Sequence, residues 1–274
     1  MSKVWFITGS SRGLGRTLVE YALKKGDSVV ATARNPETLK PLVGQYGSKK
    51  ILPITLNVTD WEAAKRVVTD AVEHFGRIDI VINNAGYANV ASVEDFDVED
   101  FRQQVNTNLM GVVYVSKAVL PTLRQQGSGH IFQISSLGGR IASPGLTAYQ
   151  CAKWAIGGFS TGLSAEVSPL GIKVTVLEPG GMRTDWAGPS MTVHPVSEPY
   201  QQTVGEFASF LQSSSGQEVT DPAKVGPIIE ELYQSAEPPI RMLVGPDSVQ
   251  YWAQAAEAQA KSDETWKELS LSSS

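Results

Sequence analysis

The sequence predicts one α/β domain, a doubly wound parallel sheet of about seven strands with helices on both faces. Short runs rich in β-branched residues alternate with longer amphipathic runs along the chain, as in repeated β-α-β units. Several short runs are almost continuously apolar, as strands covered on both faces are. The 274 residues show no break in composition, so we expect a single domain over residues 1–274.

In the first half of the chain, apolar spacing and helix-end signals locate each predicted element. Residues 4–8 are predicted as a strand and residues 14–25 as a helix, with one apolar stripe and Gly26 at its end. The others are a strand at 28–32, a short helix opening at Pro36, a strand at 51–58 buried on both faces, a helix running to Phe75 from a capping box at Thr59-Asp60-Trp61-Glu62, and a strand at 78–82.

In the second half the alternation continues. Residues 185 to about 217 are rich in Gly, Pro, Ser and Thr, so we expect a mobile lid over a substrate there, and the tail at 269–274 is expected to fray. The predicted elements are a helix from about Asp97 to Arg124, a strand at 129–135, a helix that carries Tyr149 and runs to about Val167, a strand at 172–177, a helix opened by Asp221 and Pro222, and a strand at 240–244.

Charge and hydropathy exclude several functions. The net charge is -5 and the acidic and basic residues are interspersed, so no basic stripe indicates a nucleic acid or an anionic membrane as partner. A small neutral molecule is a better candidate for the ligand than either of these polyanions. The apolar run at 4–7 is too short for a signal segment or a membrane span. We therefore expect no membrane association and a cytoplasmic location.

The thiol and imidazole side chains do not indicate metal or thiol chemistry. Cys151 is the one cysteine, which excludes an intrachain disulfide and fits a reducing compartment. A nucleophilic role is the alternative, but no histidine lies near Cys151 in the sequence, so we expect a packed side chain. His74, His130 and His194 lack metal-ligand spacing, and no metal site is expected.

A glycine-rich turn joins the first predicted strand to the first predicted helix. Its glycines allow the backbone to turn sharply and approach a pyrophosphate, and the N–H groups of the following helix add partial positive charge. We therefore predict that a nucleotide binds here. The residues of the turn expected to contact it are Gly9, Ser11, Arg12, Gly13 and Leu14.

A second pattern places Tyr149 and Lys153 four positions apart, on one face of a predicted helix. A tyrosine titrates at about pH 10, and a neighbouring ammonium group favours the phenolate, so this spacing can make the phenol exchange protons at neutral pH. For the pair taken alone, a solvated lysine is the alternative interpretation.

The order of these motifs resembles the short-chain dehydrogenase/reductase family. The glycines follow a TGxxxGxG pattern, with three residues between Gly9 and Gly13 in place of the commoner GxGxxG. The resemblance implies a Rossmann-type fold and hydride transfer between a nicotinamide and a ketone, an aldehyde or a secondary alcohol. The matches extend from residue 4 to about residue 184. The further ones are Asn83-Asn84-Ala85-Gly86, Asn108, Ser136, Tyr149 with Lys153, and Pro179-Gly180 followed by Thr184.

The resemblance implies the roles of the catalytic residues. Ser136 lies 149 − 136 = 13 positions before Tyr149, which favours it over its neighbour Ser135. Ser136 would polarise the carbonyl while Tyr149 gives or takes a proton. Lys153 would bind the nicotinamide ribose and lower the pKa of the tyrosine.

Asn108 would complete the catalytic set by holding a water behind the lysine, with Asn106 and a packing role as the alternatives. The resemblance also implies contacts from strand ends to the cofactor and the substrate. These are Asn84, Ala85 and Gly86 beside the adenine ribose, Pro179 and Gly180 over the nicotinamide, Thr184 on its carboxamide, and Met182 and Trp186 at the start of the substrate wall.

The end of the second predicted strand favours NADP(H). An acidic side chain there would bind the adenosine ribose and repel a 2′-phosphate, but Ala33 holds this position. Arg34 follows it, and with Arg12 it could bind the 2′-phosphate by charge-assisted hydrogen bonds. The resemblance also implies that Asn57 and Val58 contact the cofactor. The family usually has Asp where Asn57 stands, and an Asn oxygen can accept the same hydrogen bond from the adenine.

The first hypothesis is thus an NADP(H)-dependent reductase of ketones or aldehydes that also oxidises alcohols. A regulatory protein that binds NADP(H) without turnover is the alternative, and an intact Ser136, Tyr149 and Lys153 argue against it. An epimerase or dehydratase needs a longer C-terminal domain than this chain has. Residues 239–247 resemble the C-terminal part of retinol- and hydroxysteroid-dehydrogenase-like members, which indicates apolar substrates. The resemblance also implies a homodimer or homotetramer formed through the long central helices.

Overall fold

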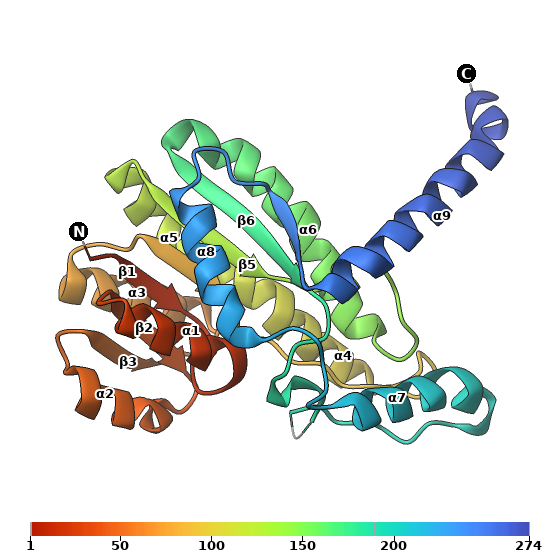
Figure 1. The fold of residues 1–274 in the computed structure, drawn as a ribbon, viewed down its shortest axis with the longest axis horizontal. Helices are drawn as coiled ribbons and strands as arrows, with labels where there is room; N and C mark the ends of the chain where they lie inside the picture. Colours follow the sequence, from red (N-terminus) through yellow and green to blue (C-terminus); the bar gives the residue numbers. More distant parts are fainter. Residues whose placement is uncertain (1, 189, 274) are drawn as a thin grey trace.

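The computed structural model describes residues 2–188 and 190–273, and within them it contains one seven-stranded sheet (Figure 1). All its strands are parallel, in the order β3-β2-β1-β4-β5-β6-β7. The predicted doubly wound sheet is therefore confirmed. The strands are β1 (Val4–Ile7), β2 (Ser28–Ala33), β3 (Ile51–Thr55), β4 (Ile80–Asn83), β5 (Gly129–Ile134), β6 (Ile172–Pro179) and β7 (Arg241–Val244).

Helices cover both faces of the sheet. Alternate residues of β1 divide between two cores, Trp5 and Ile7 on one face and Val4 and Phe6 on the other. The first face is covered by α1 (Gly13–Lys24), α2 (Lys40–Tyr46) and α8 (Val225–Gln234), and the second by α3 (Trp61–Phe75), α5 (Gly111–Gln126) and α6 (Thr147–Val167). Short 3₁₀ turns lie at Pro36–Leu39, Leu137–Gly139, Ser168–Leu170 and Pro222–Lys224.

The strand predicted at 51–58 is shorter and less buried than expected. β3 ends at Thr55 and pairs only with β2, so it is an edge strand, and most of its residues are half-buried or exposed. The helix that follows also begins differently. The carboxylate of Asp60 accepts a hydrogen bond from the N–H of Ala63 at 2.9 Å. Asp60 is therefore the N-cap, and the capping box predicted at Thr59 is wrong.

The long helix predicted at 97–124 is continuous but contains a wider turn. α4 (Val98–Val105) leads through a π turn (Asn106–Met110) into α5. Single π turns inside α-helices often occur at functional sites. This turn lies beside the first residues of α6, because both α4 and the π turn pack against that helix.

The segment expected to be a lid, residues 185–217, contains regular structure that the sequence did not predict. It has 3₁₀ turns at Asp185–Ala187 and Glu198–Tyr200, a π turn at Gln201–Gly205 and α7 (Glu206–Ser214). Val193 forms a β-bridge with Val90, and the Ser197 N–H donates to Asp95 at 3.0 Å. These bonds attach the segment to the loop that follows β4.

The sequence analysis also missed a C-terminal helix. α9 (Pro246–Leu271) starts beside β6 and β7 and projects from the body (Figure 1). Residues 269–271, expected to fray, are its last three residues. Beyond its base most of its side chains are exposed. In the part of the chain that the structure describes, neither α9 nor any other helix combines the length and hydropathy needed to cross a membrane.

Candidate active site

The glycine-rich turn lies at the carboxyl end of β1. Gly9 and Gly13 have φ of +69° and +55°, in the left-handed region that favours glycine. A Cβ on Gly15 would lie 2.3 Å from the Gly9 carbonyl oxygen, so the turn and α1 approach at backbone distance. The first turn of α1 has neither an acidic residue nor a side-chain cap, which leaves its N–H groups able to bind an anion. The side chain of Leu14 is buried in the core, so only its backbone faces the turn.

The predicted turn at residues 83–86 is bonded directly to the glycine-rich turn. The hydroxyl oxygen of Thr8 accepts hydrogen bonds from the N–H groups of Asn84 and Ala85, at 2.9 and 3.1 Å. The Asn84 amide donates to the carbonyl oxygens of Thr8 and Gly9. Gly9 is close enough that its Cβ would lie 2.9 Å from the Ala85 Cα. The two turns therefore form one hydrogen-bonded floor of the site. This floor lies at the topological switch point of the sheet, where the strand order reverses between β1 and β4.

The two arginines predicted to select the cofactor are exposed at the edge of this floor. Arg12 precedes α1 and Arg34 follows Ala33 at the end of β2. Within residues 2–188 and 190–273, neither guanidinium group forms a hydrogen bond or an ion pair. Burial raises the pKa of Tyr87, Asp100 adds to this, and the positive charge of Arg34 opposes it. The field of Arg34 thus reaches the residue that follows the 83–86 turn.

Asn57 is placed differently from its predicted role. Its side-chain oxygen accepts hydrogen bonds from both the N–H and the hydroxyl of Thr59, at 3.2 and 3.0 Å. A carbonyl oxygen has two lone pairs, so this oxygen is already satisfied. Val58 beside it is buried in the core between β3 and α5. The structure therefore shows Asn57 closing a local turn, with no lone pair left for an adenine.

Tyr149, Ser136 and Lys153 lie together at the carboxyl ends of β5 and β6. A Cβ on Gly138 would lie 3.4 Å from the Ser136 hydroxyl oxygen and 3.6 Å from the Tyr149 ring, so these two side chains are neighbours. The ammonium group of Lys153 lies 5.4 Å from the centre of the tyrosine ring. Lys153 also donates to the carbonyl oxygen of Ile134 at 2.7 Å. The hydroxyl of Ser135 instead donates to the backbone oxygen of Lys153. Of the two serines, Ser136 is thus the one beside the tyrosine.

Burial shifts both titratable groups of this cluster. Tyr149 is 6% exposed, and burial raises its pKa to about 12, while the bond from Ser136 opposes the shift. Lys153 is 4% exposed, and burial lowers its pKa to about 8. Burial, and not the charge of the lysine, therefore dominates the pKa of the phenol. At neutral pH the phenol holds its proton and the amine is largely charged.

Asn108 lies in the π turn and is fully buried. Its amide donates to the carbonyl oxygens of Tyr87 and Gln104 and accepts from the Tyr87 N–H. A Cβ on Gly86 would lie 2.4 Å from the Asn108 oxygen and 3.7 Å from the Lys153 nitrogen. Asn108 therefore faces the lysine across Gly86. Asn106 is half-buried and makes no such contact among the described residues.

The turn after β6 faces the glycine-rich turn from the other side. The methyl-bearing carbon of Thr184 would lie 3.7 Å from a Cβ on Gly13. Gly180 donates to the carbonyl oxygen of Val244, and the Gly181 N–H donates to the carboxylate of Asp247 at 2.7 Å. Asp247 was missed by sequence reasoning. The available signal was the Gly-Pro-Asp string at 245–247, with proline at the first helical position and an acid in the first turn of α9.

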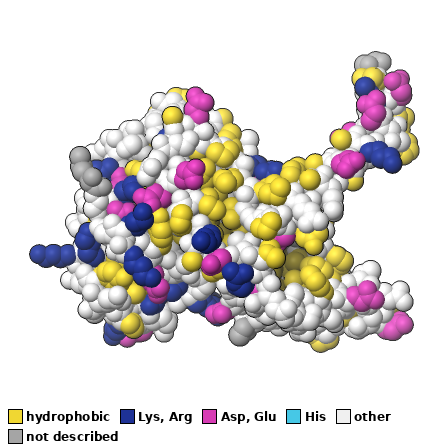
Figure 2. Space-filling view, in the orientation of Figure 1, with side chains coloured by type: hydrophobic (Ala, Val, Ile, Leu, Met, Phe, Trp, Pro, Cys, Tyr) yellow, Lys and Arg dark blue, Asp and Glu magenta, His cyan; other side chains and the backbone are white. Residues whose placement is uncertain are grey.

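The lid segment packs on Tyr149. The ring of Trp186 is 5.2 Å from that of Tyr149, and Trp186 packs against the apolar cluster around it. Met182, which was expected to lie beside Trp186, lies elsewhere. It packs against the opposite core, on Leu14 and Val225, because the chain turns toward α1 before it reaches the lid. Figure 2 shows a hollow bordered by hydrophobic side chains above α7.

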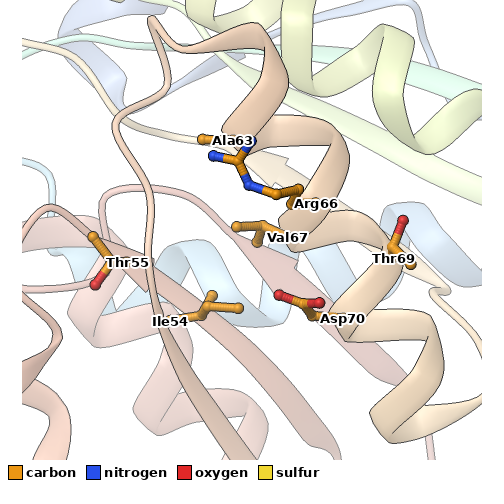
Figure 3. Close-up of a pocket in the computed structure, with 7 residues that line it drawn as sticks. All are labelled: Ile54, Thr55, Ala63, Arg66, Val67, Thr69 and Asp70. Carbon is orange, nitrogen blue, oxygen red and sulfur yellow. The ribbon is translucent and has the colours of Figure 1, made fainter.

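Other expectations concern groups outside this cluster. Cys151 is exposed on α6, so its predicted packing is wrong: the residue faces away from the core while Tyr149 and Lys153 face inward. Among the described residues, no group of His, Cys, Asp and Glu could hold a metal ion. A shallow groove between β3 and α3, lined by Thr55, Arg66 and neighbouring residues (Figure 3), contains none of the predicted site residues.

Comparisons with known proteins agree with this geometry. The sequence model of the short chain dehydrogenase family matches residues 3–192. The chain belongs to this family, and it is an oxidoreductase. It is 63% identical over 273 residues to the oxidoreductase BOA17 of Botryotinia fuckeliana, covering 100% of both chains.

Solved structures support the same assignment. A short-chain dehydrogenase from Streptomyces avermitilis has a TM-score of 0.93 and 33% identity, with 100% of both chains covered. ElxO with NADP bound has a TM-score of 0.74 and 26% identity, over 91% of this chain and 100% of that one. Other solved structures that share this fold are an alcohol dehydrogenase from Thermococcus sibiricus complexed with 5-hydroxy-NADP and a short chain dehydrogenase/reductase from Burkholderia phymatum in complex with NAD.

Proposed function

We propose that this protein transfers hydride between NADP(H) and a ketone, an aldehyde or a secondary alcohol, with Tyr149 as the general acid or base. The observation that carries the proposal is the convergence of Ser136, Tyr149 and Lys153 at the carboxyl edge of the sheet. A protein that only senses the nucleotide has no need of a buried proton donor with a serine and an amine beside it.

The residues present fit a dinucleotide. The backbone around Gly9, Gly13 and the start of α1 would hold the pyrophosphate. Gly86 leaves room beside Asn108 and Lys153, which a side chain there would fill, and this suits a ribose bound by the lysine. Thr184, opposite Gly13, would bind the carboxamide. The bound nicotinamide would supply or accept the hydride.

A preference for NADP(H) is supported by the charges at the end of β2. Arg12 and Arg34 are exposed and unpaired within the described residues, and Ala33 offers no carboxylate to repel a phosphate. Arg16, three residues further into α1 than Gly13, is by contrast bonded to Glu20 and to the Thr38 carbonyl. Two unpaired guanidinium groups at one edge suit a dianionic 2′-phosphate.

The proton chemistry follows from burial. Because the pKa of Tyr149 is raised to about 12, the phenol is protonated at neutral pH and can donate to a carbonyl oxygen as charge builds on it. The Ser136 hydroxyl, beside the phenol, would hold that oxygen. Lys153 adds a positive charge close to the developing phenolate and could return a proton to it. These groups favour reduction at neutral pH.

The test is NADPH or NADH oxidation with a panel of aryl and alkyl ketones. We expect turnover, with NADPH preferred by about tenfold or more, a difference that one charge-assisted contact can supply. Replacing both arginines, as Arg12→Ala with Arg34→Ala, should remove the preference and leave the NADH rate unchanged. A wild-type preference for NADH would contradict the cofactor assignment, and no turnover with either cofactor would contradict the enzymatic one.

A further inference from the structure

We propose that the substrate is an uncharged, apolar ketone or secondary alcohol, and that the lid rejects analogues bearing a carboxylate or phosphate because it offers them no positive charge. The proposal rests on the proposed function, since it concerns the ligand of Tyr149. It goes beyond that function by naming the property that the site selects.

The first observation is what surrounds the phenol. Apart from Ser136 and Lys153, Tyr149 packs into an apolar cluster contributed by separate segments of the chain. The loop after β4 contributes Ala88 and Val90, which are 1% and 0% exposed. Leu146 comes from the turn before α6. The lid supplies the opposite wall, including Trp186, Val204, Phe207 and Ala208.

The second observation is the charge of the lid. Residues 184–223 contain no lysine or arginine, although 23 of the 274 residues are basic. They do contain acidic residues, so the segment repels anions rather than merely lacking charge. The one imidazole, His194, lies 3.4 Å from the carboxylate of Asp100, so an anion there would also meet a negative charge. The acidic residues are Asp185, Glu198, Glu206, Glu218 and Asp221.

The third observation is that the basic groups bordering this region are already engaged. Arg140, in the turn after Ser136, is paired with the buried Glu178 and lies over the ring of Trp252. Arg183, just before the lid, donates to the carbonyl oxygens of Glu218 and Val219 and is exposed. Lys153 would be used by the ribose and the phenol.

These observations together define the ligand. Tyr149 is 6% exposed, so a carbonyl reaches its hydroxyl only by replacing apolar contacts such as that of Trp186. An apolar ketone restores those contacts from its own surface. A carboxylate on the same framework would enter the cluster without a partner, and burying an unpaired charge is costly.

The experiment compares three ketones of one shape: acetophenone, para-acetylbenzoate and para-aminomethylacetophenone. We would measure kcat/KM with NADPH and, by calorimetry, binding to the protein loaded with NADP⁺, which needs no turnover. We expect acetophenone to exceed the benzoate by roughly a hundredfold in both measurements. The amine should be disfavoured less strongly than the benzoate, because the acidic residues of the lid attract a cation while burial of its charge among the apolar side chains around Tyr149 remains costly.

Two variants test whether the lid makes the choice. Trp186→Arg places a cation beside Tyr149 and should narrow the gap between acetophenone and the benzoate by about tenfold. Phe210→Arg is the matched control, because Phe210 is 60% exposed on α7, and should leave the gap unchanged. If Trp186→Arg fails to fold, judged by melting and NADPH binding, Met191→Arg from the same apolar cluster replaces it.

Each outcome decides between the two proposals. Equal or better handling of the benzoate or the amine by the wild type would overturn the substrate class while keeping the hydride transfer. Binding of NADPH without calorimetric binding of any of the three ketones would overturn the substrate class too. A protein that binds no nicotinamide nucleotide would instead overturn the proposed function.

Discussion

At the scale of residues, burial is the property that sets the chemistry of this site. Tyr149 and Lys153 share a helix face, and the sequence spacing alone predicts that they lie together. The structure adds that water is excluded from both, so the pKa of the phenol rises and that of the amine falls. The lysine is thus the group that titrates near physiological pH, a feature that four-residue spacing does not reveal.

Replacing Tyr149 by Phe should abolish turnover, because it removes the proton donor and keeps the ring that packs on Trp186. We expect kcat to fall by roughly two to four orders of magnitude, the usual size of general acid catalysis. Nucleotide affinity, measured by fluorescence titration of NADPH, should change little. Tyr251→Phe is the control, since Tyr251 is 50% exposed on α9. A Tyr149→Phe enzyme with most of its rate would remove this residue from the chemistry.

The pH dependence of reduction should follow Lys153. Its pKa is lowered to about 8, so the amine is charged below that pH and loses its charge as pH rises through it. We expect kcat/KM to be flat below about pH 8 and to fall above it, while Tyr149, with a pKa of about 12, stays protonated throughout. Lys153→Arg keeps its charge at every pH tested. The falling limb should disappear in this variant, and its persistence would assign the limb to another group.

At the scale of elements, sequence patterns predicted what is locally determined. Each strand of the sheet and the pairing of Tyr149 with Lys153 follow from apolar periodicity and spacing. The position of a strand within the sheet does not follow from these patterns. The sequence of β3 is apolar enough for an interior strand, but β3 lies at the edge, because the crossover connections set the strand order. Cys151 likewise faces solvent, since helix periodicity fixes relative faces and not which one meets the core.

Two further features, the helix α9 and the role of Asn57, could not be predicted from the sequence for a different reason. α9 lacks a strong apolar stripe, because most of it packs against nothing in its own chain, so periodicity could not find it. The role of Asn57 depends on which of two donors, a local N–H or a distant ligand, its oxygen accepts a hydrogen bond from. The structure shows the local donor, and sequence spacing does not distinguish the two.

The contact between α9 and the turn after β6 leads to a steric prediction. A Cβ on Gly180 would lie 2.2 Å from the carboxylate of Asp247, so Gly180→Ala must displace that carboxylate, which holds the turn that we propose faces the nicotinamide. We expect NADPH binding to weaken by about 1–3 kcal/mol, the usual cost of overpacking. Adding Asp247→Ala removes the clash and should recover part of that loss.

The double-mutant cycle for this pair uses the dissociation constant of NADPH as its measurement. Gly158→Ala on α6 is the control, because a Cβ there meets nothing within 4 Å, and its binding should match the wild type. Strictly additive losses for Gly180→Ala and Asp247→Ala would show that the two residues are not coupled.

At the scale of the whole molecule, the exposed face of α6 suggests assembly. Trp154 is 53% exposed there, close to the exposed Cys151 on the same face. We propose a homodimer or homotetramer that uses the long central helices α5 and α6. Light scattering should give a native mass of two or four times 29.5 kDa. Trp154→Glu should shift it toward the monomer by placing a charge in the interface.

The control for this prediction is Trp266→Glu, which alters a tryptophan that is 61% exposed near the end of α9. It should leave the native mass unchanged. If Trp266→Glu dissociates the protein and Trp154→Glu does not, the subunits associate through α9 instead.

The bond between Gly181 and Asp247 has a consequence for biosynthesis. The glycine-rich turn, the tyrosine and the lysine all leave the ribosome before β7 and α9, which supply the partners of Gly180 and Gly181. A nascent or proteolysed chain that stops before residue 241 carries the proposed proton donor but lacks the support for the turn that we propose covers the coenzyme. Incomplete translation products of this chain should therefore be inert, and redox activity should begin only once synthesis is finished.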